Sequence, residues 1–219
     1  IAHIQLRRSN QAESEKRVFA LIEAAGWPIW PLLLASIIAL AIIGERAWSL
    51  RSSMVAPKGL LNQTVQELKQ QGVTPQLVAR LANGSPLGQV LAAGVKNAKS
   101  TPQVMKEALD DAGRAVAHEL ERFLTTLGTI ASISPLLGLL GTVIGMIEIF
   151  GSQAPSGSNP IVLAHGISVA LYNTAMGLVV AIPSMIFYRH FRSRVDSLIV
   201  EMESQAVLLV EILHGERQN

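Results

Sequence analysis

Two threonines lie in apolar segments of the sequence that together contain a single charged residue, Glu148. Thr142 belongs to the segment SPLLGLLGTVIGMIEIF, and Thr174 belongs to the segment GISVALYNTAMGLVVAIPSMIFY. A hydroxyl group donates and accepts hydrogen bonds without carrying a fixed charge, so it can line a path for protons. A threonine can also bond back to a carbonyl of its own helix, so each threonine alone is a weak signal.

Small and polar residues recur at steps of three or four around both threonines, and this spacing puts them on one face of a helix. Small residues at this spacing are usually typical of tight helix packing, which accounts for the glycines and alanines. A hydroxyl on each of two adjacent helices favours a polar-lined interface or pore. The candidate pore-lining residues are Thr142, Thr174, Ser134, Asn173, Gly138, Gly145, Ala170 and Gly177.

The composition predicts a membrane protein. Hydrophobic residues make up 49% of the 219 residues, and the net charge is only +2. This small charge, without a basic run, gives no support for binding to nucleic acid. The chain has no cysteine, which excludes disulfides, thiol nucleophiles and cysteine metal sites. We expect no metal and no cofactor.

Three segments are predicted to cross the membrane. Residues 27–44 are uncharged, and at a rise of about 1.5 Å per residue they just cross a hydrocarbon core of about 30 Å. Tryptophans mark both ends of this span, as is typical of membrane interfaces. The predicted fold is all-α, with transmembrane helices within residues 27–50, 124–150 and 161–188.

A helical domain is predicted between the first two spans, at residues 51–123. Thr74, Ser85 and Thr101 each precede a proline, and a capping hydroxyl followed by a proline is typical of a helix start. Gly72 and Gly84 lie where helices are expected to end. The expected short helices cover residues 60–71, 75–83 and 86–98.

Two apolar seams extend the second and third spans. No strong helix breaker occurs between Pro102 and Pro135, so one helix is predicted from residue 102 to about residue 150. The tail at residues 189–219 continues the third span, and Gly215 is its expected stop. The two seams are predicted to pack antiparallel on one another. Their residues are Met105, Leu109, Ala112, Val116, Leu120, Phe123, Leu127, Phe191, Val195, Leu198, Met202, Ala206, Leu209 and Leu213.

Positive charge sets the expected topology. Arginines follow the first span, precede the second and follow the third, which puts these three ends on the cytoplasmic side. Residues 151–160 then form a periplasmic loop. Residues 1–26 are an amphipathic segment on the periplasmic side, expected either to lie at the membrane surface or to pack as a surface helix of the protein. The C-terminus is expected in the cytoplasm.

Two long motifs carry a resemblance to a known family. The second span contains LLGLLGTVIGMI, and the third contains GISVALYNTAMGLVVAIP. Both segments resemble the signature segments of the MotA, TolQ and ExbB proton-channel family, over about residues 132–188. The three-span layout is more similar to ExbB and TolQ than to MotA, which has four spans.

The resemblance implies a function and partners. ExbB-like proteins form a homopentamer in the bacterial inner membrane, and their second and third spans line a pore. The pore encloses single-span ExbD-like partners, whose aspartate binds and releases protons, and a TonB-like protein transmits the work to outer-membrane receptors. By this resemblance the pore threonines of the family correspond to Thr142 and Thr174.

One position departs from the family pattern. Relatives commonly place a glutamate in the third span where this sequence has Val169, and no acidic residue lies between Glu148 and the arginines at 189–194. A titrating carboxylate within the membrane normally marks a proton relay. The partner is therefore expected to supply it. Glu148 and His165 lie near the outer ends of their spans and are interpreted as interfacial residues.

Other functions are weighed against the channel. An enzyme is not expected, because the segment His118–Arg122 is not HExxH and no Walker loop occurs. Three spans without an internal repeat make a poor solitary transporter. Two alternatives stay open: a TolQ-like subunit that serves envelope integrity, and a membrane scaffold that conducts nothing.

Overall fold

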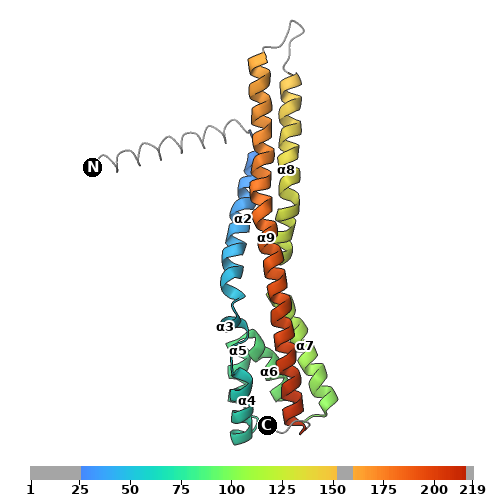
Figure 1. Cartoon of the computed structure of the whole chain (residues 1–219). Coiled ribbons are helices and arrows are strands. Elements are labelled where there is room, and N and C mark those ends of the chain that lie inside the picture. Colours follow the sequence, from blue (N-terminus) through green and yellow to red (C-terminus); the bar gives the residue numbers. More distant parts are fainter. Residues whose placement is uncertain (1–25, 152–159, 216–219) are drawn as a thin grey trace, which may run out of the picture. The chain divides into compact units, whose positions relative to one another are not determined.

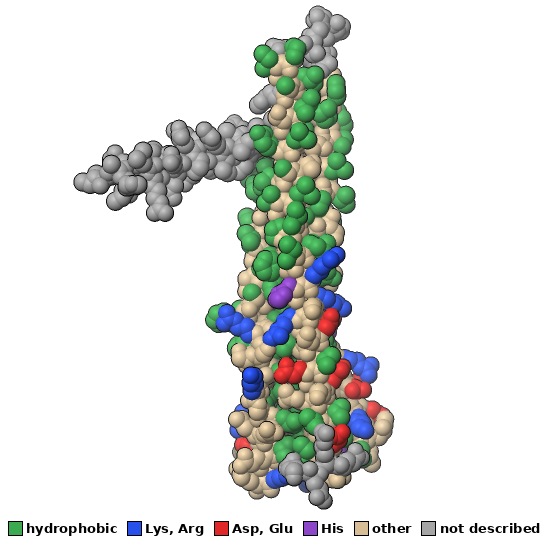
Figure 2. Space-filling model, in the orientation of Figure 1, with side chains coloured by type: hydrophobic (Ala, Val, Ile, Leu, Met, Phe, Trp, Pro, Cys, Tyr) green, Lys and Arg blue, Asp and Glu red, His purple; other side chains and the backbone are tan. Residues whose placement is uncertain are grey.

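The structure, a computed structural model, describes residues 26–151 and 160–215 (Figure 1). The chain divides into two compact units, Ile1–Ile42 with Thr126–Phe187, and Ile43–Thr125 with Tyr188–Asn219. They are termed here the apolar unit and the charged unit, because Figure 2 shows Lys, Arg, Asp and Glu side chains gathered on the second. The amphipathic segment predicted at the N-terminus and most of the predicted periplasmic loop lie outside the described residues.

Every regular element of the described residues is a helix, which confirms the all-α prediction. Three of the described stretches hold helices that are long and apolar enough to cross a membrane: Ile29–Ser49, Pro102–Gly151 and Gly166–Leu213. Each overlaps one of the three predicted spans, and the second and third stretches extend beyond residues 124–150 and 161–188. In chain order the helices are α2 (Ile29–Ser49), α3 (Ser52–Val55), α4 (Leu60–Gln71), α5 (Pro75–Gly84), α6 (Pro86–Lys96), α7 (Pro102–Leu120), α8 (Leu124–Gly151) and α9 (Pro160–Leu213).

The predicted capping residues start the short helices of the charged unit. Thr74 Oγ1 accepts a hydrogen bond of 3.2 Å from the Leu77 N–H at the start of α5. Ser85 and Thr101 accept equivalent bonds at the starts of α6 and α7. A proline occupies the first turn of each helix, where no intrahelical partner for its missing N–H is needed. The three sequence signals are confirmed.

The apolar seams are buried in the core of the charged unit, where α6 contacts both. A Cβ atom on Gly94 of α6 would lie 2.9 Å from Leu109 Cδ2 of α7 and 2.9 Å from Leu209 Cδ2 of α9. The seams therefore converge on a third helix and do not pack only on one another. The buried seam residues of this unit are Met105, Leu109, Val116, Leu120, Phe191, Val195, Leu198, Met202, Ala206 and Leu209.

The predicted continuous helix from residue 102 to about residue 150 is interrupted. Helix α7 ends at Leu120, and α8 begins at Leu124. Between them Phe123 has a φ of 64°, a left-handed conformation that costs a bulky residue roughly 1–3 kcal/mol. Phe123, a predicted seam residue, is instead 41% exposed. The sequence has no glycine or proline at this point, so no local signal predicted the turn.

A buried arginine stabilises this turn. Arg46 of α2 is 6% exposed, and its Nη1 donates a 3.1 Å hydrogen bond to the carbonyl oxygen of Leu120. The last carbonyls of a helix lack intrahelical donors, and a cation at this end also interacts favourably with the helix dipole. The guanidinium is neutralised by Glu45, whose Oε1 accepts a 2.9 Å bond from Nη2. Arg46 is thus the side chain that caps α7.

The substitution Arg46→Gln should lower the free energy of unfolding by about 2–4 kcal/mol, because it removes a buried charged donor and leaves the Leu120 carbonyl without its partner. Equilibrium unfolding of the full chain in detergent, followed by the helical circular dichroism signal, measures this change. Arg80→Gln is a matched control, since the Arg80–Glu67 ion pair is largely exposed and should contribute less than about 1 kcal/mol. Equal losses in the two variants would contradict the capping role.

Candidate functional site

Helices α8 and α9 approach each other closely at glycines of the apolar unit. A Cβ atom on Gly138 would lie 2.7 Å from the Asn173 carbonyl oxygen and 2.9 Å from Thr174 Cα. A Cβ atom on Gly177 would lie 2.6 Å from the Ser134 carbonyl oxygen. These distances leave no room for a side chain. Glycine at both positions is therefore required for the two backbones to come so near.

The side chain of Asn173 occupies the space above a third glycine. A Cβ atom on Gly141 would lie 2.8 Å from both Cβ and Cγ of Asn173. Asn173 is 2% exposed, so its amide is held between the helices. A polar side chain in this position packs against Gly141, which has no side chain of its own. Size complementarity at this pair fixes how α8 sits on α9.

The glycine contacts define an antiparallel register. Gly138 lies against Thr174, and Gly145 lies against Ala170, whose Cβ is 3.4 Å from the Cβ position of Gly145. In this register Thr142, one turn after Gly138, lies within about one helical turn, ~5.4 Å along the axis, of the level of Thr174. The structure therefore brings the two threonines to nearby levels of the same helix pair.

The eight candidate residues divide into two groups by exposure. Five are buried in the contact between the two helices of the same chain: Ser134, Gly138, Ala170, Asn173 and Gly177. Three are half-buried: Thr142, Gly145 and Thr174. The buried group sets the distance between the helices. The half-buried threonines are the members of the set that carry a hydroxyl group and are not fully enclosed between the two helices.

The Thr142 hydroxyl bonds to its own helix. Its Oγ1 donates a 2.7 Å hydrogen bond to the Leu139 carbonyl oxygen. The Ser134 hydroxyl does the same with the Ile130 carbonyl oxygen, at 2.7 Å. Such back-bonds satisfy the donor in an apolar surrounding and leave the lone pairs of the oxygen as acceptors. An acceptor on the half-buried face of a span is suited to bind water or a hydrated proton.

Three further residues of the two spans were singled out in the sequence. Glu148 lies on α8 near its end and is exposed. The side chains of His165 and Val169 lie outside the described part of the structure. Of the two residues near the outer ends, the structure therefore places only Glu148, on the surface of its helix.

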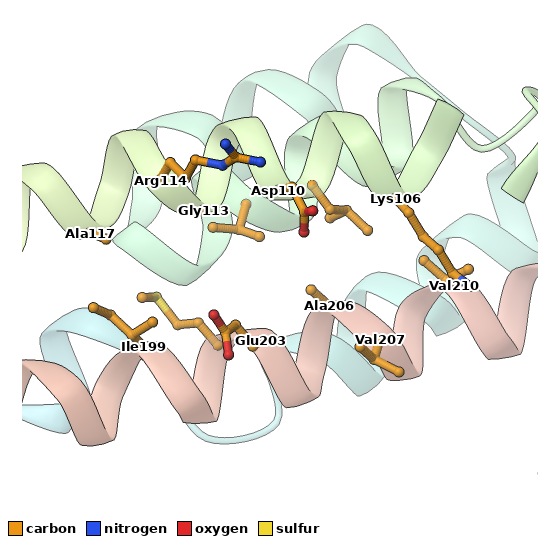
Figure 3. A pocket seen from close by; sticks show the side chains of 13 residues that line it. Lys106, Asp110, Gly113, Arg114, Ala117, Ile199, Glu203, Ala206, Val207 and Val210 are labelled. Carbon is orange, nitrogen blue, oxygen red and sulfur yellow. The ribbon is translucent and has the colours of Figure 1, made fainter. Parts of the chain in front are cut away.

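A cavity of about 490 Å³ lies in the charged unit, between α7 and α9 (Figure 3). Apolar side chains such as Met202 and Val210 line most of it, and Lys106, Asp110, Arg114 and Glu203 stand around it. No group of three or more His, Asp or Glu residues that could hold a metal ion occurs within the described residues. The cavity thus has the character of a gap in helix packing with charged edges.

The sequence-based prediction of the site did not include two residues that have a role in helix packing or capping. Gly141 was not among the eight candidates, although it receives Asn173. Its GxxxG spacing with Gly145 is the signal in the sequence that could have identified it. Arg46 was interpreted only as an interfacial charge, and no pattern in the sequence indicates that it contacts Leu120, 74 residues away.

These features define a multi-span membrane protein with a polar stripe: three apolar spans, a closely packed α8–α9 pair and two half-buried threonines. Residues 82–204 of the chain match the MotA/TolQ/ExbB proton channel family. The match covers more than half of the chain, so the chain belongs to this family, whose members are transport proteins and not enzymes.

Individual relatives support the same assignment. The chain is 33% identical over 201 residues to the biopolymer transport protein ExbB-like 3 of Synechocystis sp., covering 88% of this chain and 95% of the relative. It is 35% identical over 173 residues to the biopolymer transport protein exbB1 of Vibrio cholerae, covering 75% of each chain. A 42% identity to the biopolymer transport protein ExbB of Salmonella typhimurium extends over 84 residues, 38% of this chain and 34% of the relative.

The substitution Gly177→Ala should lower the free energy of unfolding by about 1–3 kcal/mol, because the added methyl group must displace the α8 backbone. Unfolding of the full chain in detergent measures the loss. Gly44→Ala is a matched control in another span, since a Cβ atom there meets nothing within 4 Å and alanine is preferred in a helix. If Gly177→Ala is as stable as Gly44→Ala, the close approach at Gly177 is refuted.

Proposed function

We propose that this chain is an ExbB-like subunit of a proton channel in the bacterial inner membrane. With an ExbD-like partner it would convert the proton motive force into mechanical work for TonB-dependent outer-membrane transport. The observation that carries the proposal is the pair of half-buried threonines on two glycine-packed apolar helices, in a chain of this family. Similarity to relatives named ExbB supports the ExbB branch.

In this proposal Thr142 and Thr174 line the proton path, and the buried small residues hold the wall of the pore in shape. Ser134, Gly138, Gly145, Ala170, Asn173 and Gly177 contribute by letting α8 and α9 form a thin, closely packed wall. Several copies of the chain, five by analogy with the family, would place this wall around the partner helices. The charged unit would face the cytoplasm, since its arginines follow the positive-inside rule.

The proton-binding carboxylate is proposed to come from the partner. No Asp or Glu occurs between Glu148 and Asp196, so the third span has no acidic residue of its own. A proton that crosses about 100 mV releases about 2.3 kcal/mol from the potential. The chain would supply the hydroxyl-lined wall, and the partner would supply the group that takes up and releases this proton.

The substitutions Thr142→Val and Thr174→Val should each reduce proton flux by about tenfold or more. Valine has the same shape as threonine but lacks the hydroxyl, and a hydrogen bond to a charged group contributes about 1.5–3 kcal/mol. Flux is measured with a pH-sensitive dye in vesicles that contain the chain and its ExbD-like partner. Size-exclusion chromatography checks that the assembly is unchanged.

Ser168→Ala is the matched control for the threonines. Ser168 is exposed on α9, and its hydroxyl bonds to the Ala164 carbonyl oxygen at 2.9 Å. This variant should conduct as the wild type does. Full flux in both valine variants would contradict a proton path along these hydroxyls, and the chain would then serve the conducting assembly only as a scaffold.

The chain without a partner should conduct no more protons than empty vesicles do, because its third span has no carboxylate. Adding the ExbD-like partner should restore flux, and the same flux measurement compares the two samples. A partner-independent current would contradict the proposed division of roles.

Copurification with TolR-like and TolA-like proteins, and not with ExbD-like and TonB-like proteins, would establish the TolQ-like alternative.

A further inference from the structure

We propose that Arg51 and Arg122 of the charged unit bind the phosphate groups of anionic phospholipids. Each arginine lies beside the end of a helix that can cross the membrane. Arg51 follows the last residue of α2, Ser49, by two positions, and Arg122 precedes the first residue of α8, Leu124, by two. This binding does not depend on proton conduction.

Each of the two guanidinium groups is held against an exposed aromatic ring. The Cζ atom of Arg51 lies 4.5 Å from the ring centroid of Trp48, and that of Arg122 lies 4.7 Å from the ring centroid of Phe123. These distances are within the range of a cation–π interaction. The rings are 63% and 41% exposed, respectively. The aromatic ring restrains each guanidinium group. The N–H groups of the guanidinium stay available to an incoming acceptor.

Two carboxylates of this region are engaged by other arginines. Glu45 pairs with Arg46, and Glu121 pairs with Arg192 at 3.3 Å. In the described ranges, neither Arg51 nor Arg122 has a carboxylate oxygen within the 4.0 Å of an ion pair. Their positive charge is therefore not neutralised by the residues that the structure describes, and it is complementary to an anion.

Arg46 connects the two parts of this patch. Its Cζ atom lies 5.6 Å from the Phe123 ring centroid, and its Nη1 donates to the Leu120 carbonyl oxygen. The segment that carries Trp48 and Arg51 is thereby tied to the turn that carries Arg122. Both aromatic-backed arginines belong to the same region of the charged unit.

An anionic lipid suits this patch better than a free anion does. Basic clusters directly beside a membrane helix attract anionic headgroups, at about fivefold in affinity per arginine. A planar guanidinium can donate two parallel hydrogen bonds to a phosphate. Exposed aromatic rings beside the charges are typical of the membrane interface, where apolar chains and headgroups meet. An amphiphile would satisfy the rings and the guanidinium groups together.

Native mass spectrometry of the full chain tests the proposal. The chain is released from mixed micelles of phosphatidylglycerol and phosphatidylcholine that have identical acyl chains, so only the headgroup differs. The wild type should retain phosphatidylglycerol at least about fivefold over phosphatidylcholine. The double variant Arg51→Gln/Arg122→Gln should lose this preference. Trp48→Leu keeps the charge of Arg51 but removes its ring, so it should show a partial loss.

The control is the double variant Arg80→Gln/Arg114→Gln, which removes two exposed arginines from α5 and α7 of the same unit. It should retain the preference of the wild type. Equal losses in the two double variants would reduce the effect to net charge, and an undiminished preference without Arg51 and Arg122 would exclude the site. Release of the lipid by excess inorganic phosphate would identify a site for free anions and overturn the lipid assignment.

Discussion

The steric contact between the α8 and α9 backbones is the constraint on which the apolar unit depends. In a bilayer, the surrounding lipid is as apolar as the helices, so association rests on close packing. Gly138 and Gly177 allow this approach, and Asn173 fills the space over Gly141. The contact also decides which polar groups remain accessible. Asn173 and Ser134 are enclosed, whereas Thr142 and Thr174 are half-buried.

The charged unit contains a second constraint. Helix α7 ends and α8 begins there without a glycine at the turn between them. The left-handed residue at the turn is Phe123, and its strain is offset by the hydrogen bond from Arg46 to Leu120 and by two guanidinium groups near the ring. The arginines near the ends of the candidate spans thus also have structural roles here. One caps a helix, one bonds to Glu121, and two lie over exposed aromatic rings.

Local chemistry was predictable from the sequence, and contacts between distant residues were not. Thr74, Ser85 and Thr101 cap helices as their hydroxyl–proline pairs indicated, and Gly72 and Gly215 adopt the positive φ expected at helix ends. The turn at Phe123 depends on Arg46, which no local pattern connects to it. The small-residue stripe was ambiguous for a physical reason: residues that pack two helices of one chain and residues that line a pore require the same spacing, and only the structure reveals which are enclosed.

The fit of Asn173 over Gly141 has a consequence for how the family can vary. The two positions share one volume, so a side chain at position 141 requires a smaller residue at position 173. Among relatives that keep this helix register, the two positions should therefore change together, and the covariation should be one of size. If Gly141 were replaced first, its new side chain would collide with Asn173 and the protein would be strained. A smaller residue at position 173 is therefore expected to arise first.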